Sequence, residues 1–210
     1  MKVTAVIPAY NEESRIEKVI IPILETDIIS NIIVVDDGSQ DSTSNIVSNY
    51  NVDLVRISRN KGKAEAIKKG IKCCEGESDI IVLLDADLVG LTPSHIKALV
   101  LPVLEKGVDM TIGIFKSGRY ITDLAQSIAP NLSGQRAIKS SVAYEIVDMD
   151  VEGYCIEAAF SQLVKKRNLN VENVTLKNVT HVIKEEKVGF IKGISWRLQM
   201  YRDIVRYLIH

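Results

Sequence analysis

Apolar runs alternate with segments of helical periodicity along the first half of the chain. The runs are continuously apolar, which is typical of parallel strands covered on both faces, and they occupy residues 3–8, 31–37, 52–58, 79–85 and 108–115. Between them, apolar residues recur at helical spacing around 16–24, 64–71 and 92–103. This alternation predicts an α/β fold, with a mostly parallel, Rossmann-like sheet flanked by helices.

The second half of the chain is less regular. Residues 116–150 mix Gly, Ser, Pro and Arg with short apolar patches, so we expect loops and short helices over the open end of the sheet. A helix from about 154 to 166 and a strand within 171–182 should follow. Residues 190–209 carry an apolar stripe, which predicts a final helix packed on the domain. A helix of this kind could also touch a membrane surface.

Composition narrows the class of protein. Lys and Arg number 26 against 27 Asp and Glu, so no general attraction to nucleic acid is expected. The three cysteines form neither a disulfide framework nor a zinc-site spacing. The start of the sequence shows no signal-peptide pattern, and no apolar run approaches the ~20 residues that cross a bilayer. We therefore expect a cytoplasmic protein of one domain without a transmembrane segment.

Polar residues follow four of the predicted strands. Each group also fits an ordinary turn, but the carboxyl ends of parallel strands meet at one edge of a sheet, where ligands bind. Four such groups in succession predict a binding site at that edge. They are Pro8-Ala9-Tyr10-Asn11-Glu12, Asp36-Asp37-Gly38-Ser39, Arg59-Asn60-Lys61-Gly62-Lys63 and Asp85-Ala86-Asp87.

The sequence lacks both glycine-rich loops that commonly hold phosphates. No G-x-G-x-x-G follows the first strand, and no G-x-x-x-x-G-K-[ST] occurs. Asp85 and Asp87 offer another solution, because two carboxylates one residue apart can share a divalent cation that grips a diphosphate. Mg²⁺ or Mn²⁺ there would act as a Lewis acid for a departing nucleotide.

The stretches "VIPAYNEE", "IIVVDDGSQDST", "RNKGKAEAI" and "IVLLDADL" together resemble the nucleotide-sugar glycosyltransferases of family 2 and their relatives. The likeness is strong over about residues 3–90 and continues more thinly to about 185. It implies a GT-A fold for the single domain 1–210, with a nucleotide-binding half at about 1–115 and an acceptor-binding half at about 116–210.

The same resemblance implies roles for individual residues. Tyr154 and Glu157 of "EGYCIEAAF" would border the sugar, and His181 would complete the metal site. On the nucleotide side, Asp37 would accept a hydrogen bond from the base, Lys63 would lie near the base or diphosphate, Asp85 would face ribose and metal, and Asp87 would bind the metal directly. The nucleoside pocket would be lined by Pro8, Ala9, Tyr10 and Glu12.

Two groups of relatives suggest different acceptors. "SGRYITDLAQ" resembles a segment of glucosyl- and mannosyl-3-phosphoglycerate synthases, in which Gly118, Arg119 and Thr122 would clasp the acceptor's phosphate and carboxylate. The inserted Ile121 departs from that pattern. "LSGQRA" resembles the S-G-F-R-A of polyprenyl-phosphate sugar transferases, with Arg136 meeting a lipid phosphate. Both acceptors are anionic, and guanidinium groups suit them.

The resemblance implies a metal-dependent hexosyltransferase that moves a sugar from a nucleotide-sugar, with UDP-glucose as the favoured donor, to a small anionic acceptor. Asp87, Glu157 and Arg119 would be central to catalysis. A hydroxyl acceptor would also need a base, for which the candidates are Asp148, Asp150 and Glu152.

Several alternatives stay open on the sequence alone. They are a polyprenyl-phosphate glycosyltransferase, a non-catalytic nucleotide-sugar sensor and, less well matched, a nucleotidyltransferase. The sequence also leaves room for peripheral membrane contact and a homodimer, and does not decide between inversion and retention at the anomeric carbon.

Overall fold

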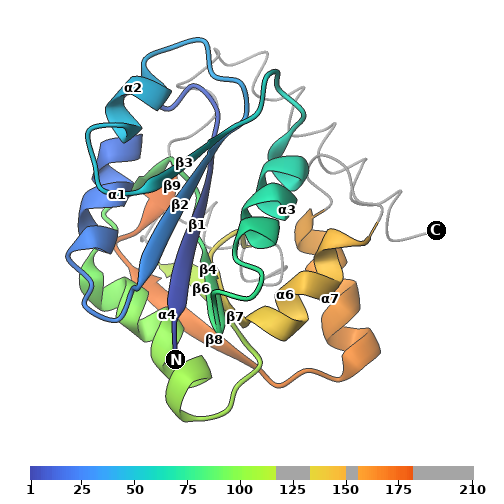
Figure 1. The fold of residues 1–210 in the computed structure, drawn as a ribbon. Coiled ribbons are helices and arrows are strands. Elements are labelled where there is room, and N and C mark those ends of the chain that lie inside the picture. The colour runs from blue at the N-terminus through green and yellow to red at the C-terminus, as the bar shows by residue number, and fades with distance from the viewer. Residues whose placement is uncertain (117–132, 150–155, 182–210) are drawn as a thin grey trace, which may run out of the picture.

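The structure, a computed structural model of the 210-residue chain, describes residues 1–116, 133–149 and 156–181. These residues form three layers, with a seven-stranded sheet between two groups of helices (Figure 1). The predicted α/β class is confirmed.

The strand order in the sheet is β3-β2-β1-β4-β7-β6-β8. Neighbouring strands are parallel except at β7, which runs antiparallel to β4 and to β6. A separate small sheet pairs β5 (Leu88–Val89) with β9 (Thr180–His181). The strands of the main sheet are β1 (Val3–Ala9), β2 (Asn31–Asp36), β3 (Asp53–Arg56), β4 (Ile80–Leu83), β6 (Met110–Lys116), β7 (Arg136–Lys139) and β8 (Val171–Lys177).

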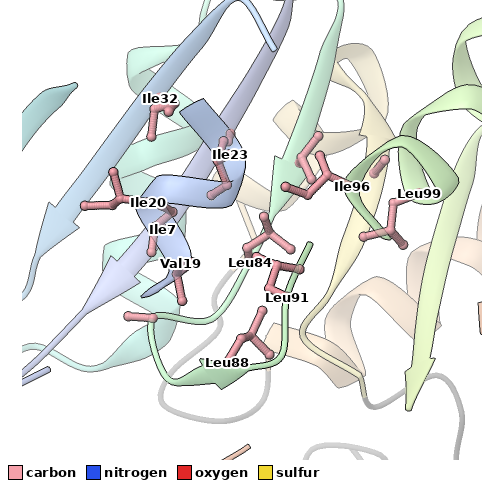
Figure 2. Close-up of a cluster of buried hydrophobic side chains, with 14 of the residues drawn as sticks. Ile7, Val19, Ile20, Ile23, Ile32, Leu84, Leu88, Leu91, Ile96 and Leu99 are labelled. Atoms are coloured by element: carbon pink, nitrogen blue, oxygen red, sulfur yellow. The ribbon is translucent and has the colours of Figure 1, made fainter. Parts of the chain in front are cut away.

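Helices cover both faces of the sheet, and each face has its own apolar core (Figure 1). One face carries α1 (Ile16–Leu24), α2 (Thr43–Val47) and α4 (Pro93–Glu105), and the other carries α3 (Lys63–Cys73), α6 (Ser140–Val147) and α7 (Ile156–Arg167). Figure 2 shows the first core, where Ile20 of α1 and Ile96 of α4 point toward the strands and Leu88 of β5 closes the cluster.

Helix α3 lies unusually close to the sheet because of one glycine. A Cβ added at Gly70 would stand 2.3 Å from Cγ1 of Val6 in β1 and 3.1 Å from Cγ2 of Val35 in β2. Only a residue without a side chain fits this spacing. The close contact fixes α3, and with it Lys63 at the first position of the helix, against the strands that form the predicted site.

The first half of the chain matches the sequence-based prediction, whereas the segment 116–150 matches it only in part. Loops and short helices were expected there; α6 is such a helix, but residues 136–139 form β7 in the middle of the sheet, which the prediction missed. Residues 117–132 and 150 lie outside the described residues. The predicted final helix at 190–209 lies outside the described residues. Within the part of the chain that the structure describes, no helix is long and apolar enough to cross a membrane.

One ion pair joins three strands at the amino end of β6. Asp109 accepts hydrogen bonds from the Lys139 ammonium, at 2.7 Å, and from the backbone N–H of Asn170, at 2.9 Å. The Lys139 side chain and the Asn170 N–H are the main reasons that the pKa of Asp109 lies below its usual value. A carboxylate with a lowered folded-state pKa stabilises the fold above its unfolded pKa and loses that contribution as pH falls.

We therefore expect Asp109→Asn to lower the free energy of unfolding at pH 7 by roughly 0.5–1 kcal/mol. The difference from the unmodified protein should shrink as pH falls from about 5 toward 2. Urea unfolding across this pH range measures it. Asp27→Asn, which removes an exposed pair with Lys97, is the control and should change stability less. A difference for Asp109→Asn that stays constant with pH would contradict the assignment.

Candidate active site

The loops that follow β1 and β2 are bonded to each other at the carboxyl edge of the sheet. The backbone N–H of Asn11 donates to Oγ of Ser39 at 2.9 Å, and the backbone N–H of Gln40 donates to Oδ1 of Asn11 at 2.9 Å. Asn11 takes a left-handed backbone conformation, with φ of 55°, which asparagine tolerates better than most residues. These bonds hold the two predicted nucleoside-binding loops in one fixed relation.

The residues expected to line a nucleoside pocket differ in their exposure. Tyr10 is 42% exposed at the end of β1, so its ring can serve as an open aromatic surface. Pro8 and Ala9 belong to the strand itself, paired with Val35 and Asp36 of β2. Glu12 is only 8% exposed and forms an ion pair with Arg15.

Asp37 joins the ends of three strands. Its backbone N–H donates to the carbonyl of Ala9 at 2.8 Å. Its carboxylate accepts the backbone N–H groups of Lys61, at 2.9 Å, and of Gly62, at 2.7 Å. The residue is 3% exposed, and this burial raises the pKa of its carboxyl above the usual value, against the two backbone hydrogen bonds. Asp37 thus positions the loop that leads to Lys63.

Lys63 links two carboxylates that stand far apart in the sequence. Its Nζ lies 2.7 Å from Oδ1 of Asp85, just beyond β4, and 2.8 Å from Oε1 of Glu157 in the first turn of α7. Burial alone would lower the pKa of this lysine, but the two carboxylates outweigh it and raise the pKa above its usual value. The side chain therefore stays a charged ammonium, and it brings the predicted nucleotide-side and sugar-side residues together.

Two residues that sequence reasoning missed complete the surroundings of Asp85. The Gln135 side-chain amide donates to Oδ2 of Asp85 at 2.8 Å. A Cβ added at Gly134 would stand 2.7 Å from the same oxygen and 2.9 Å from Nζ of Lys63. The stretch "LSGQRA" contains both residues, but only its arginine was singled out from the sequence. They reach Asp85 because β7 is antiparallel, which places its amino end beside the carboxyl end of β4.

Arg136, expected at a lipid phosphate, is buried beneath this cluster with 1% of its surface exposed. Its guanidinium donates to the Ser133 carbonyl at 2.7 Å and stacks on the ring of Phe160 in α7, 4.6 Å from the ring centre. Burial lowers the pKa of Arg136 to about 10, against the attraction of Glu157 and Asp85. In this structure Arg136 connects β7 to α7 in the interior of the protein.

Asp87 and the backbone of His181 are brought close by the small sheet. Asp87 directly precedes β5, and Leu88 of β5 is the register partner of His181 in β9. Among the residues that the structure describes, no group of three or more His, Cys, Asp or Glu side chains forms a cage for a metal ion. Asp85 and Asp87 still supply hard carboxylate oxygens. This donor set fits an ion that shares its remaining coordination with a substrate's phosphates, as Mg²⁺ commonly does.

Several predicted site residues lie outside the described residues: Gly118, Arg119, Thr122 and Tyr154, with Asp150 and Glu152 among the candidate bases. Of the candidate bases, Asp148 is described, and it lies exposed at the carboxyl end of α6.

A shallow cavity of about 200 Å³ lies at the opposite end of the sheet, lined by residues that include Ile23, Asn31 and Asp53. Asn31 and Asp53 are bonded to each other there, at 2.8 Å. This cavity contains none of the strand-end residues that carry the predicted chemistry.

Comparison with known proteins identifies the family of this chain. A family model described as glycosyl transferase family 2 matches residues 4–149. A protein of Methanocaldococcus jannaschii, described as uncharacterized, is 32% identical over 200 residues, which cover 85% of this chain and 82% of that protein. Dolichol-phosphate mannosyltransferase of Pyrococcus furiosus is 33% identical over 127 residues, which cover 58% of this chain but only 34% of that enzyme.

Among solved structures, glucosyl-3-phosphoglycerate synthase from Mycobacterium tuberculosis in complex with phosphoglyceric acid is similar, with a TM-score of 0.71 and 25% identity. The match covers 86% of this chain and 72% of that one. The same synthase solved with Mn²⁺, UDP-glucose and phosphoglyceric acid has a TM-score of 0.71 and 24% identity, over 95% of this chain and 79% of that one.

Proposed function

This chain belongs to glycosyl transferase family 2 and is a glycosyltransferase with the GT-A fold, and on that premise we propose that it transfers glucose from UDP-glucose to a small anionic acceptor such as 3-phosphoglycerate. The proposal rests on the site described above and on the similar synthase bound to phosphoglyceric acid.

One observation carries the proposal further than family membership does. At the edge where the strands end, the Lys63 ammonium lies within 2.8 Å of a carboxylate oxygen of Asp85 and of Glu157. The three residues come from different parts of the fold. A nucleotide-sugar needs groups for its diphosphate and for its sugar side by side, and this cluster offers a cation between two carboxylates. Binding and orientation by such preorganised groups supply most of the rate enhancement in transfers of this kind.

The loops after β1 and β2 would hold the nucleoside. The exposed ring of Tyr10 offers a stacking surface. The Asp37 carboxylate, which accepts the backbone N–H groups of Lys61 and Gly62, would accept a further hydrogen bond from the base. Pro8, Ala9 and Glu12 would form the floor of the pocket. Lys63 would neutralise diphosphate charge, and Glu157 would accept hydrogen bonds from the sugar hydroxyls, with Tyr154 beside it.

Asp85 and Asp87 would hold a divalent cation, with His181 as a further ligand. When bound, Mg²⁺ or Mn²⁺ would act as a Lewis acid that stabilises the leaving diphosphate. This chain's own residues keep Asp85 in place: Gln135 bonds one of its oxygens and Lys63 the other.

In the reaction the bond between the anomeric carbon and the diphosphate oxygen breaks, and a bond between that carbon and an acceptor oxygen forms. The nucleoside diphosphate leaves with the electron pair of the broken bond. Gly118, Arg119 and Thr122 would hold the anionic acceptor. A hydroxyl acceptor loses its proton during the transfer, and Asp148, Asp150 and Glu152 are the carboxylates proposed to take it.

A polyprenyl phosphate is the second candidate acceptor. It is favoured by the similarity to dolichol-phosphate mannosyltransferase, which extends over 127 residues. The burial of Arg136 weighs against the specific contact inferred from "LSGQRA", because a guanidinium with 1% exposure does not reach a lipid phosphate without rearrangement.

A donor and acceptor screen tests the proposal. The purified protein would be incubated with UDP- or GDP-hexoses, each combined with 3-phosphoglycerate, a short polyprenyl phosphate or simple sugars, in the presence of Mg²⁺ or Mn²⁺. We expect the highest turnover with UDP-glucose and 3-phosphoglycerate, and mass spectrometry should show a glucosylated acceptor and free UDP.

The outcomes separate the alternatives. If glucose is transferred only to the polyprenyl phosphate, the acceptor is the lipid phosphate and the assignment of 3-phosphoglycerate is wrong. Release of pyrophosphate would indicate nucleotidyl transfer instead. The protein could instead bind UDP-glucose tightly but neither transfer its glucose nor slowly hydrolyse it under any condition. That outcome would support a sensor and contradict the proposed reaction.

A further inference from the structure

Both carboxylate oxygens of Asp85 have partners within the protein itself. Oδ1 lies 2.7 Å from the Lys63 ammonium, and Oδ2 accepts the Gln135 amide at 2.8 Å. The backbone of Gly134 presses against the same group, because even a methyl group there would stand 2.7 Å from Oδ2. A cation that binds Asp85 through Oδ1 must therefore either share that oxygen with the Lys63 ammonium or displace it.

Lys63 is held in this place from several sides. It is the first residue of α3, and the loop before it is bonded to Asp37 through two backbone N–H groups. Its second carboxylate partner, Glu157, comes from α7 at 2.8 Å. Since two carboxylates share one ammonium, moving Lys63 away would leave two negative charges close together in a mostly buried site, with the buried Arg136 guanidinium as the remaining positive charge near them.

A divalent ion alone is a poor replacement. No group of three or more acidic, histidine or cysteine side chains able to hold a metal ion is found among the described residues, so we expect the ion to take further oxygens from a ligand. It would also meet the positive charge of Lys63 at short range. A nucleoside diphosphate changes both conditions, because it brings phosphate oxygens as ligands and negative charge that offsets the ammonium and the ion together.

We propose that Lys63 couples metal binding to nucleotide binding: in the donor-free protein its ammonium holds Asp85, and Asp85 accepts a divalent cation only when a nucleoside diphosphate is bound. This inference rests on the proposed function and adds to it the order in which the metal and the nucleotide bind. Metal and nucleotide bind together rather than metal first, and Lys63 is a positioning residue for the empty site as well as a group that faces the donor.

Mn²⁺ binding tests the proposal without any turnover. Free Mn²⁺ would be measured by electron paramagnetic resonance, with and without UDP, for the unmodified protein and for Lys63→Met. In the unmodified protein we expect UDP to tighten Mn²⁺ binding by at least about tenfold. In Lys63→Met, Mn²⁺ should bind about tenfold more tightly than in the unmodified protein when UDP is absent, so the effect of UDP should largely disappear.

Matched variants separate this role from simple loss of charge. Lys72→Met removes the same charge from the exposed last turn of α3 and should leave Mn²⁺ binding unchanged. Lys63→Arg should keep the dependence on UDP, because it keeps the cation. Glu157→Gln should also keep Mn²⁺ binding weak without UDP, because the contact between Lys63 and Asp85 remains. Lys63→Gln, a milder change, covers the case in which Lys63→Met does not fold, as judged by circular dichroism.

The two proposals fail differently. If folded Lys63→Met or Lys63→Gln binds Mn²⁺ as weakly as the unmodified protein without UDP, the coupling role of Lys63 is wrong while the proposed transferase stands. If the unmodified protein binds Mn²⁺ equally well with and without UDP, the coupling is again wrong. If UDP and Mn²⁺ do not bind at all, the donor and metal assignment itself is overturned.

Discussion

Asp87→Ala is expected to lower kcat/KM for sugar transfer by about 10²- to 10³-fold, the loss typical of removing one preorganised group that stabilises transition-state charge. The residue lies between two buried neighbours, Ala86 and Leu88, so its backbone is fixed while its own side chain remains partly exposed. We therefore expect the folded structure to survive and the metal-dependent part of UDP binding to disappear. Isothermal titration with UDP, with and without Mg²⁺, measures the second effect directly.

Asp53→Ala is the control for this experiment. It removes an exposed aspartate from the start of β3, at the other end of the sheet, and should leave kcat/KM within about twofold, as surface changes away from a site usually do. If Asp87→Ala retained most of its activity, and UDP still bound better with Mg²⁺, Asp87 would not be a metal ligand. The metal would then have to be held elsewhere.

Gly134→Ala is expected to have the second-largest effect, a loss of about 100-fold in kcat/KM, because displacements of about 1 Å in a catalytic cluster can cost that much. The added methyl group would lie 2.7 Å from Oδ2 of Asp85 and 2.9 Å from Nζ of Lys63. Contacts this short force the ion pair to shift. Overpacking of this kind should also cost about 1–3 kcal/mol in the free energy of unfolding.

Gly76→Ala provides a matched comparison. Gly76 has a φ of +76° and no atom within 4 Å of an added Cβ, so alanine there should cost about 1–2 kcal/mol through backbone strain alone. Activity should not change in folded Gly76→Ala, whereas Gly134→Ala should lose activity even at temperatures where it is fully folded. Unfolding by urea and steady-state kinetics on both variants separate these effects. Equal activity in the two would show that Gly134 has no role at the site.

The fold of the first half could be predicted because each buried parallel strand has an uninterrupted apolar run. Residues 80–83, Ile-Ile-Val-Leu, are an example, and all of them are buried. Strand β7 gives no such signal, because its sequence is Arg-Ala-Ile-Lys and two of its four residues are cations. A buried arginine is rare enough that a sequence pattern favours the surface for it. Its place inside depends on partners that are distant in the sequence or hidden from a local pattern, among them the ring of Phe160, the Ser133 carbonyl and the charges of Glu157 and Asp85.

The site was predictable to a similar extent. Groups that follow parallel strands, such as Asp37 and Asp85, were found because the carboxyl ends of those strands meet at one edge. Gln135 and Gly134 were missed because they precede an antiparallel strand, so the same rule applied to strand ends passes over them. The pairing of Lys63 with Glu157 spans 94 positions, and no local pattern encodes a contact of that range.

The position of β7 has a consequence for how the chain folds as it is synthesised. Strands β4 and β6, joined through α4, emerge from the ribosome before residues 136–139, yet in the finished sheet β7 lies between them. Until it emerges, β4 presents an unpaired apolar edge, and β6 can close directly onto it in a non-native arrangement. The native pairing of β4 and β6 with β7 can therefore form only after residues 136–139 have emerged. A nascent chain stalled before that point would be prone to aggregate.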